Sequence, residues 1–571
     1  MKRWNKDVII IIVIGLIIRF ILLPYSQTVH ADAISRILNA ELWLSNPHYI
    51  IADVWGPLSS YLYGFSIHFM GGKIYGPKII NTLFAAFTVY PLYWFTQNVF
   101  KTRSGSVFVA IIYTITPLVI RNSFQALPAI PCAFFMAFSM YYLSNYIKSL
   151  KLNYVVFAGV MITCAGALRY EAWIISFFFG LILLFHKKYA AFFTFGFVAA
   201  IFPVSWLMGN HIIYDNWFYC FQYSSEWTIN ELQSFSEISN LKAIKRILFF
   251  PYSLIIVLSP LVFSLILYVL PHLIIKKRIT KNQLIWLIPF LGLLIIYVYK
   301  AINGSLLLQH KYTVSLLVLL IPFFSLLFLQ QEKLIKRISI LAVILIIPSS
   351  FIMNKIPWEK GFSFSSTLSL AVNDLFIDAY RETEMVPKLA NKNFKLLVDE
   401  SNKNYKPGDG VITDFLGWEN TYYYALHSKK RPFIIEGGKS ENIDFEGLNN
   451  YITKHKEGLI TFSYFGKLLM HYNGNKNIIQ IKNINHLLKL QLIKKEDGFM
   501  LFRYRVIQKK NLKFTKQTVL TFKKDINYYT FQIKQDHHWL GKIKKQAKRE
   551  SKSLDEMIRL NAEYCLKNLS N

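Results

Sequence analysis

The segment HADAISRILNAELWLSNPHYIIADVWGPLSSYLYG, residues 30–64, contains two short amphipathic patterns. Apolar residues recur at helical spacing from Ala33 to Leu44, with polar residues between them. Asn46-Pro47 ends this pattern, and a second one begins after Gly56-Pro57. The segment therefore predicts two interfacial helices within residues 31–70, which lie along a membrane surface and do not cross it.

Eleven stretches around this segment are apolar enough to be read as membrane spans. Hydrophobic residues make up 53% of the 571 residues and charged residues only 17%, whereas soluble domains are about 25% charged. A helix needs about 20 apolar residues to cross the hydrocarbon, with about 17 at the low end. The stretches are 8–24, 77–100, 106–121, 126–147, 154–168, 171–186, 189–209, 249–275, 283–300, 312–330 and 338–353. We expect an α-helical polytopic membrane domain over residues 1–353, with an uncleaved first span.

Lys and Arg residues indicate which side of the membrane each connection faces. Short cytoplasmic connections carry an excess of these residues. With a cytoplasmic N-terminus, 16 of the 27 basic residues in 1–353 fall in such connections. The odd number of spans then places the C-terminal part of the chain outside, together with the loops at 25–76 and 210–248.

Most carboxylates fall on one side of this expected domain. Of the ten acidic residues in 1–353, eight fall outside or at the outer membrane surface, and none lies in the middle of an expected span. Ion-coupled transporters use ionisable groups at mid-membrane depth, so this pattern disfavours that class. Carboxylate chemistry is therefore expected at the outer face.

The rest of the chain has the charge density of a water-soluble domain. Strand-like and helix-like patterns alternate in residues 354–507, which predicts an outer α/β domain with a partly parallel sheet. Residues 508–571 form a basic extension in which helices are expected. The formal net charge of +31 does not indicate a nucleic-acid partner, because much of it lies in membrane-flanking loops.

Several motifs share their order and sidedness with a known family. Trp55-Gly56-Pro57-Leu58 lies in the first outer loop, and Gly76-Pro77-Lys78-Ile79-Ile80-Asn81 opens the second span. Thr116-Pro117-Leu118-Val119-Ile120-Arg121 ends the third span, and Leu168-Arg169-Tyr170-Glu171-Ala172-Trp173 joins the fifth to the sixth. Together with an acid in the first outer loop, this order over about 350 residues resembles the GT-C membrane glycosyltransferases. It is most similar to the protein-mannosyltransferase and aminoarabinose-transferase-like group (glycosyltransferase families 39 and 83).

The resemblance implies a fold, a donor and a catalytic base. The fold is a bundle of spans with an outer catalytic cleft, and the donor is a sugar on a polyprenyl monophosphate. The base is an Asp or Glu of the first outer loop, which falls on Asp32; the local pattern alone also allows Asp32 to be a helix N-cap. Many relatives carry a second acid where this sequence has Ala129, and Gln125 is the nearest polar side chain that could substitute. The resemblance implies no catalytic metal, and no other cofactor is expected.

Sugar transfer from a lipid phosphate also requires cations. A carboxylate takes the proton of the acceptor hydroxyl as it attacks the anomeric carbon, and cations stabilise the phosphate that leaves. The residues expected at the donor phosphate are Arg169, Lys311, Arg121 and His310, with Glu171, Tyr170, Gln125 and Tyr312 in support. Each has a simpler structural reading, such as an Arg169–Glu171 ion pair, an end-of-span arginine at 121, or an interfacial anchor at 310–312.

The sequence therefore predicts a glycosyltransferase that acts at the outer membrane face. It would move a sugar from a polyprenyl-phosphate donor to a hydroxyl of an acceptor protein, lipid or glycan in a single inverting displacement. Two other classes stay open: a transporter or flippase of lipids or sugars, and a non-catalytic membrane scaffold. The expected location is the plasma membrane of a bacterium, with membrane lipid as a partner and no nucleic acid.

Overall fold

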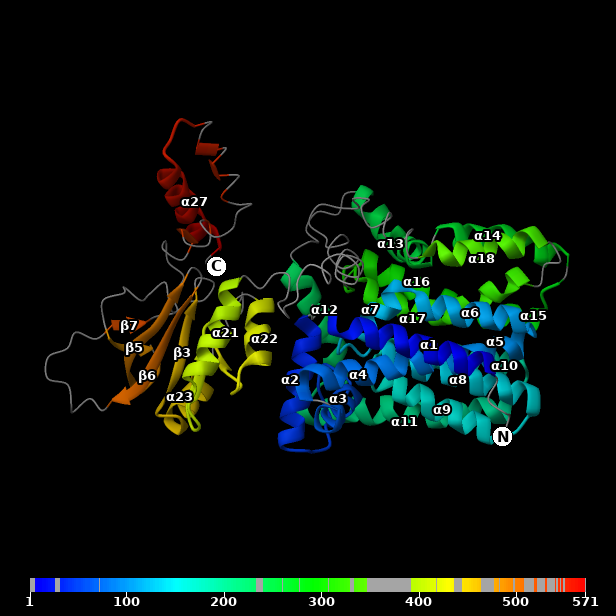
Figure 1. Ribbon diagram of the computed structural model, residues 1–571, viewed down its shortest axis with the longest axis horizontal. Helices are drawn as coiled ribbons and strands as arrows, with labels where there is room; N and C mark the ends of the chain where they lie inside the picture. Colours follow the sequence, from blue (N-terminus) through cyan, green and yellow to red (C-terminus); the bar gives the residue numbers. More distant parts are fainter. Residues whose placement is uncertain are drawn as a thin grey trace. The chain divides into compact units, whose positions relative to one another are not determined.

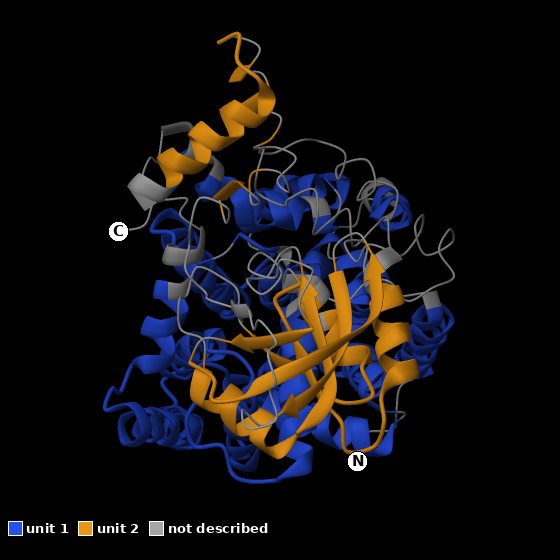
Figure 2. Ribbon diagram, turned by 90° about the vertical axis from the view of Figure 1, so that its left-hand side faces the viewer, with its two compact units in different colours: residues 1–385 blue, residues 386–571 orange. Residues whose placement is uncertain are grey.

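The computed structural model divides into two compact units, residues 1–385 and 386–571 (Figure 2). In the first unit the structure describes residues 6–25, 31–70, 72–232, 240–328 and 333–346, apart from 259, 277 and 307. In the second unit it describes residues 392–435, 444–463 and 477–507 with short gaps, and parts of 518–569.

The described part of the first unit is helical and follows the expected apolar stretches (Figure 1). Its α-helices are α1 Lys6–Leu22, α2 Ala31–Ser45, α3 Leu58–Phe69, α4 Gly72–Phe87, α5 Val89–Phe100, α6 Arg103–Ile115, α7 Pro117–Ser123, α8 Ala129–Ser149, α9 Asn153–Gly166, α10 Glu171–Phe185, α11 Tyr189–Tyr214, α12 Tyr219–Leu232, α13 Asn240–Leu258, α14 Pro260–Ile275, α15 Lys281–Leu284, α16 Ile288–Ile302, α17 Thr313–Leu320 and α18 Lys333–Ile344. The 3-10 helices are η1 Leu23–Tyr25, η2 Ile285–Leu287, η3 His310–Tyr312 and η4 Ile321–Phe328. Apolar side chains from most of these helices form one continuous buried core.

Three described helical segments are long and apolar enough to cross a membrane: Gly72–Phe100, Tyr189–Tyr214 and Lys281–Ile302. The number rises to five if each of two bent helix pairs is one span. Other apolar helices are shorter, such as Asn153–Gly166 and Glu171–Phe185. At about 1.5 Å per residue, helices of this length reach only about 22 Å, less than the hydrocarbon thickness of about 30 Å. The expected total of eleven spans therefore stays a prediction.

Both bent pairs have a proline at the bend. The expected span 249–275 contains two helices inclined by 97°, and Pro260 opens the second. Helix α7 begins at Pro117 and is inclined by 56° to α6. Proline lacks the N–H that would continue the helical ladder, and its ring clashes with the preceding turn. The expected span 249–275 is therefore bent, either as one broken span or as a re-entrant pair of helices.

Arg19 of α1 is fully buried at the bend between α6 and α7. Its Nη1 donates to the carbonyl of Gly15 at 3.1 Å, and its Nη2 donates to the carbonyl of Thr114 at 3.1 Å. Because the ladder breaks at Pro117, carbonyls at the end of α6 lose their helical partners. Arg19 thus supplies a donor to the broken end of α6 and holds α1 against it.

The two interfacial helices predicted within 31–70 are present as α2 and α3. Asn46 and Pro47 end α2, and α3 starts directly after Gly56-Pro57, as the sequence predicts. The two helices pack against each other, and the ring of Trp43 lies 5.0 Å from that of Tyr61. Between them runs an irregular loop, residues 46–57, which leads to the candidate site.

The second unit contains a mixed sheet with the order β2-β1-β3-β6-β5-β4-β7. The strands are β1 Gly410–Thr413, β2 Phe433–Ile434, β3 Glu457–Ser463, β4 Ile478–Ile481, β5 Leu487–Glu496, β6 Phe499–Ile507 and β7 Thr518–Leu520. β1 runs parallel to β2 and β3, whereas β3, β6, β5 and β4 pair antiparallel. The predicted α/β domain with a partly parallel sheet is confirmed.

Helices cover both faces of this sheet, and strand alternation explains how. Val411 packs with side chains of α21 (Lys392–Asn404) and α22 (Trp418–His427). Its neighbour Ile412 points to the other face and packs with side chains of α23 (Phe445–Lys454). Successive residues of a strand point to opposite faces, so each strand contributes side chains to the apolar clusters on both faces of the sheet. A further helix, α27 (Leu554–Leu569), has its own small core in the basic extension.

Candidate active site

Asp32 lies in the first turn of α2, where its carboxylate forms an ion pair with the ammonium of Lys311. Lys311 belongs to η3, so the two residues are 279 positions apart in the chain. The Asp32 side chain is 40% exposed and the Lys311 side chain only 10%. The expected catalytic base and one expected phosphate-binding cation are thus in direct contact.

A second ion pair joins Arg169 and Glu171 at the corner between α9 and α10. Both side chains are only 10% exposed, and the hydroxyl of Ser315 donates to Oε1 of Glu171 at 3.5 Å. Burial, the largest single effect, lowers the pKa of Arg169, but the surrounding groups, with the Glu171 carboxylate foremost, together raise it. The Arg169–Glu171 ion pair, which is the structural alternative to a phosphate-binding role, is therefore formed. Arg169 is a charged guanidinium held in a fixed position.

The ring of Tyr312 connects the two pairs. The guanidinium of Arg169 lies over this ring at 4.8 Å, and the ammonium of Lys311 lies 5.6 Å from its centroid. A cation over an aromatic face is stabilised by the negative face of the ring. The ring of Tyr312 thus contacts both cations, and one of them, Lys311, is paired with Asp32.

Arg36 is a basic residue of the expected outer loop to which the sequence assigned no specific role. It follows Asp32 by one helical turn, its Nη1 donates to Oγ of Ser59 at 3.0 Å, and its guanidinium lies 4.4 Å above the ring of Trp55. Its charge is near enough to interact with those of Asp32 and Arg169. The i, i+4 spacing from Asp32 and the aromatic motif after it were the available signals.

The two motifs at 55–58 and 168–173 meet in space. The N–H of Leu58 donates to the carbonyl of Ala167 at 3.2 Å, and the hydroxyl of Tyr170 donates to the carbonyl of Val54 at 2.6 Å. Gly56 lies so close to Ala167 that a Cβ there would stand 2.3 Å from the Ala167 carbonyl oxygen. Glycine is needed for this approach, which brings Arg169 next to α2.

Helix α11 supports the same loop from another side. The Nε1 of Trp206 donates to the hydroxyl of Tyr170 at 3.2 Å. One turn further along, a Cβ on Gly209 would lie 1.8 Å from the carbonyl oxygen of Ile51. The loop is therefore packed against α11 with no room for a larger residue.

Gly209→Ala is expected to displace loop 46–57, because its methyl group would overlap the Ile51 backbone. We expect a loss of about 1–3 kcal/mol in stability, typical of overpacking. Gly196→Ala is the matched control on the same helix, since nothing lies within 4 Å of its Cβ position. Thermal unfolding of the two detergent-purified variants measures the difference. Equal unfolding temperatures would contradict the close approach.

A third carboxylate, Asp53, lies in the same loop. Burial raises the pKa of its carboxyl, while the backbone N–H of Val54 and the charge of Arg36 oppose the rise. Glu41 of α2 lies elsewhere and pairs with Lys73 at 3.4 Å. Asp53 is thus electrostatically linked to the site through Arg36, whereas Glu41 has a separate surface partner.

The remaining expected residues surround this arrangement. Arg121 is 6% exposed on α7, which packs against η3. Gln125 is buried, and Nδ2 of Asn81 donates to its backbone carbonyl at 2.5 Å. Ala129 is fully buried at the first position of α8, so the place of the second acid is occupied by core packing. The side chain of His310 lies outside the described residues.

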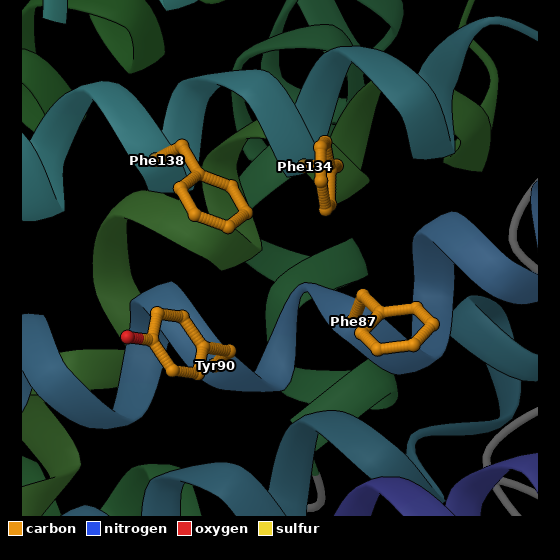
Figure 3. Close-up of a pocket in the computed structure, with 4 residues that line it drawn as sticks. All are labelled: Phe87, Tyr90, Phe134 and Phe138. Carbon is orange, nitrogen blue, oxygen red and sulfur yellow. The ribbon is translucent and has the colours of Figure 1, made fainter. Parts of the chain in front are cut away.

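Two other features do not belong to the charged cluster. An apolar groove of about 180 Å³ lies between α4–α5 and α8, where Phe87 and Tyr90 face Phe134 and Phe138 (Figure 3). All four lining residues are aromatic, so this groove offers no cation to a phosphate. Across the described residues, no group of three His, Cys, Asp or Glu side chains is arranged to hold a metal ion.

The comparisons with known proteins rest on structure. No family model matches the sequence, and no curated protein matches it. ArnT from Cupriavidus metallidurans, in its structure bound to undecaprenyl phosphate, superposes with a TM-score of 0.58 at 10% identity, over 87% of this chain and 97% of that one. An oligosaccharyltransferase from Archaeoglobus fulgidus, in complex with zinc and sulfate, gives a TM-score of 0.50 at 13% identity, over 80% of this chain and 68% of that one. The similarity therefore covers most of the chain.

Proposed function

We propose that this chain, which has the GT-C fold of ArnT and the oligosaccharyltransferase, is a glycosyltransferase that uses a polyprenyl-phosphate-linked sugar. The observation that carries the proposal is the contact between Asp32 and Lys311 beside Arg169 and Tyr312. It combines a carboxylate base with cations suited to a phosphate. The ArnT structure contains undecaprenyl phosphate, a ligand of the class proposed here.

The proposed reaction is a single displacement at the anomeric carbon. Asp32 takes the proton of the acceptor hydroxyl while the hydroxyl oxygen forms a bond to the anomeric carbon. The bond from that carbon to the phosphate oxygen breaks, and its electron pair stays on the phosphate. Lys311 and Arg169 stabilise the charge that develops there. The configuration of the sugar is inverted, and no general acid is needed because the leaving phosphate is ionised.

The position of the carboxylates favours this function over a transporter. In the described residues of the three candidate spans, no Asp or Glu lies within Gly72–Phe100, Tyr189–Tyr214 or Lys281–Ile302. Coupled transporters place such groups inside their spans. The buried Ala129, which stands where many relatives carry a second acid, supports a non-catalytic scaffold. A scaffold, however, does not explain why a half-exposed carboxylate is paired with a buried lysine close to a second cation.

The proposed orientation follows from the charge pattern of the connections. We propose an integral protein of a bacterial plasma membrane with its N-terminus in the cytoplasm, and with α2, α3 and the second unit outside. The acceptor hydroxyl would belong to a protein, lipid or glycan at that surface.

The test is transfer by the detergent-purified full chain supplied with polyprenyl-phosphate-linked sugars extracted from membranes. Mass spectrometry is expected to show release of polyprenyl phosphate and an acceptor heavier by one sugar. The contrary result would come from the same protein reconstituted in vesicles. Movement of the intact lipid-linked sugar across the bilayer, with the sugar still attached, would favour a flippase.

A further inference from the structure

The Asp32–Lys311 pair differs from the Arg169–Glu171 pair in how its members are exposed. Both members of the second pair are 10% exposed, so Arg169 has a buried carboxylate of its own. In the first pair the carboxylate side is 40% exposed and the lysine side 10%. The ammonium of Lys311 is therefore engaged by a carboxylate that stands at the more open side of the contact.

This engagement conflicts with the role of Asp32 as a base. A carboxylate in contact with an ammonium group is stabilised in its charged form, and it therefore binds a proton less readily. The same ammonium is the cation expected to hold the donor phosphate. Lys311 is thus expected to pair with two anions, the Asp32 carboxylate and the donor phosphate. The structure shows its contact with Asp32.

Resting on the proposed function, we propose that Lys311 is shared between Asp32 and the donor phosphate, so that binding of the lipid phosphate draws Lys311 away from Asp32 and releases the carboxylate to act as a base. The phosphate takes over contacts of the Lys311 ammonium, and the charge of Lys311 does not change. Asp32 keeps the charge of Arg36 nearby, one helical turn along α2. The acceptor proton then moves to Asp32 only when a donor is in place.

The arrangement makes proton transfer to Asp32 depend on the donor. An acceptor that arrives first meets a carboxylate held by Lys311, which accepts its proton poorly. A donor that arrives first both occupies the cations and frees the base. The site is thereby prevented from deprotonating an acceptor when no sugar is present.

The experiment measures binding of undecaprenyl phosphate to the purified full chain, for example by native mass spectrometry of the protein in detergent. Asp32→Asn removes the competing charge and is expected to tighten binding about tenfold, within the range of typical coupling between two sites. The tightening is expected to disappear when Lys311→Gln is present as well. Glu41→Gln is the matched control, because it removes a carboxylate of the same helix that pairs with Lys73.

The outcomes separate this inference from the proposed function. Unchanged or weaker binding by Asp32→Asn overturns the sharing of Lys311, even if that variant is inactive. Tightening that persists in the Lys311→Gln background also overturns it, because Asp32 would then repel the phosphate directly. Wild-type protein that binds no polyprenyl phosphate contradicts the proposed function itself. Thermal unfolding of each variant establishes that the measured chains are folded.

Discussion

Asp32→Asn is expected to abolish sugar transfer while the protein stays folded and inserted in the membrane. Asparagine has nearly the same shape as aspartate but cannot accept the proton of the attacking hydroxyl. Removing a positioned general base typically costs about 10²- to 10⁴-fold in rate. Because the Asp32 side chain is 40% exposed, its replacement leaves no buried void. Release of polyprenyl phosphate from a lipid-linked sugar measures the effect.

Glu41→Gln is the control for this experiment, since Glu41 lies on the same helix and pairs with Lys73 at 3.4 Å. It is expected to retain wild-type transfer. An Asp32→Asn variant with full activity would remove Asp32 from the mechanism and leave the charged cluster without a base.

The local elements of this fold were predictable because their signals are local. The amphipathic pattern from Ala33 to Leu44 predicts α2, which spans Ala31–Ser45. The strand-like patterns within 354–507 likewise predict strands there, of which β1 and β3 are two. In each case the signal is the spacing of apolar residues together with nearby turn residues and prolines, and it is read over a few neighbouring positions.

The directions of the helices in the membrane unit were harder to predict from the sequence. An apolar run gives the length of a buried segment but not its direction, so 249–275 reads as a span with no sign of the 97° bend before Pro260. A proline within an apolar run is compatible with a straight span, a kink or a break. Only packing of the surrounding helices selects among these.

The candidate site was predicted as a set of residues but not as an arrangement. Charge sidedness and the family resemblance singled out Asp32, Arg169 and Lys311 separately. Their convergence depends on contacts between positions 279 residues apart, which no local pattern encodes. Arg36 was recognisable only as an outer-face cation for the same reason, because its place in the site depends on Trp55 and on Ser59 of α3.

Arg169→Ala is expected to weaken binding of polyprenyl phosphate by about 10- to 100-fold, the value of one charge-assisted hydrogen bond to a phosphate. The substitution also leaves the Glu171 carboxylate buried without its cation. Removing one partner of a buried ion pair costs about 3–5 kcal/mol in stability, so this variant is expected to unfold at a lower temperature as well. Binding and stability must therefore be measured on the same preparation.

Two further variants separate these effects. Arg169→Ala combined with Glu171→Gln removes both charges, so stability is expected to recover in part while binding of the lipid phosphate stays weak. Arg169→Lys keeps the charge but loses the planar fork and the stacking over Tyr312 at 4.8 Å, so an intermediate affinity is expected. If the folded double variant binds polyprenyl phosphate as tightly as the wild type, Arg169 serves only to neutralise Glu171, and the donor phosphate must rely on Lys311 and its neighbours.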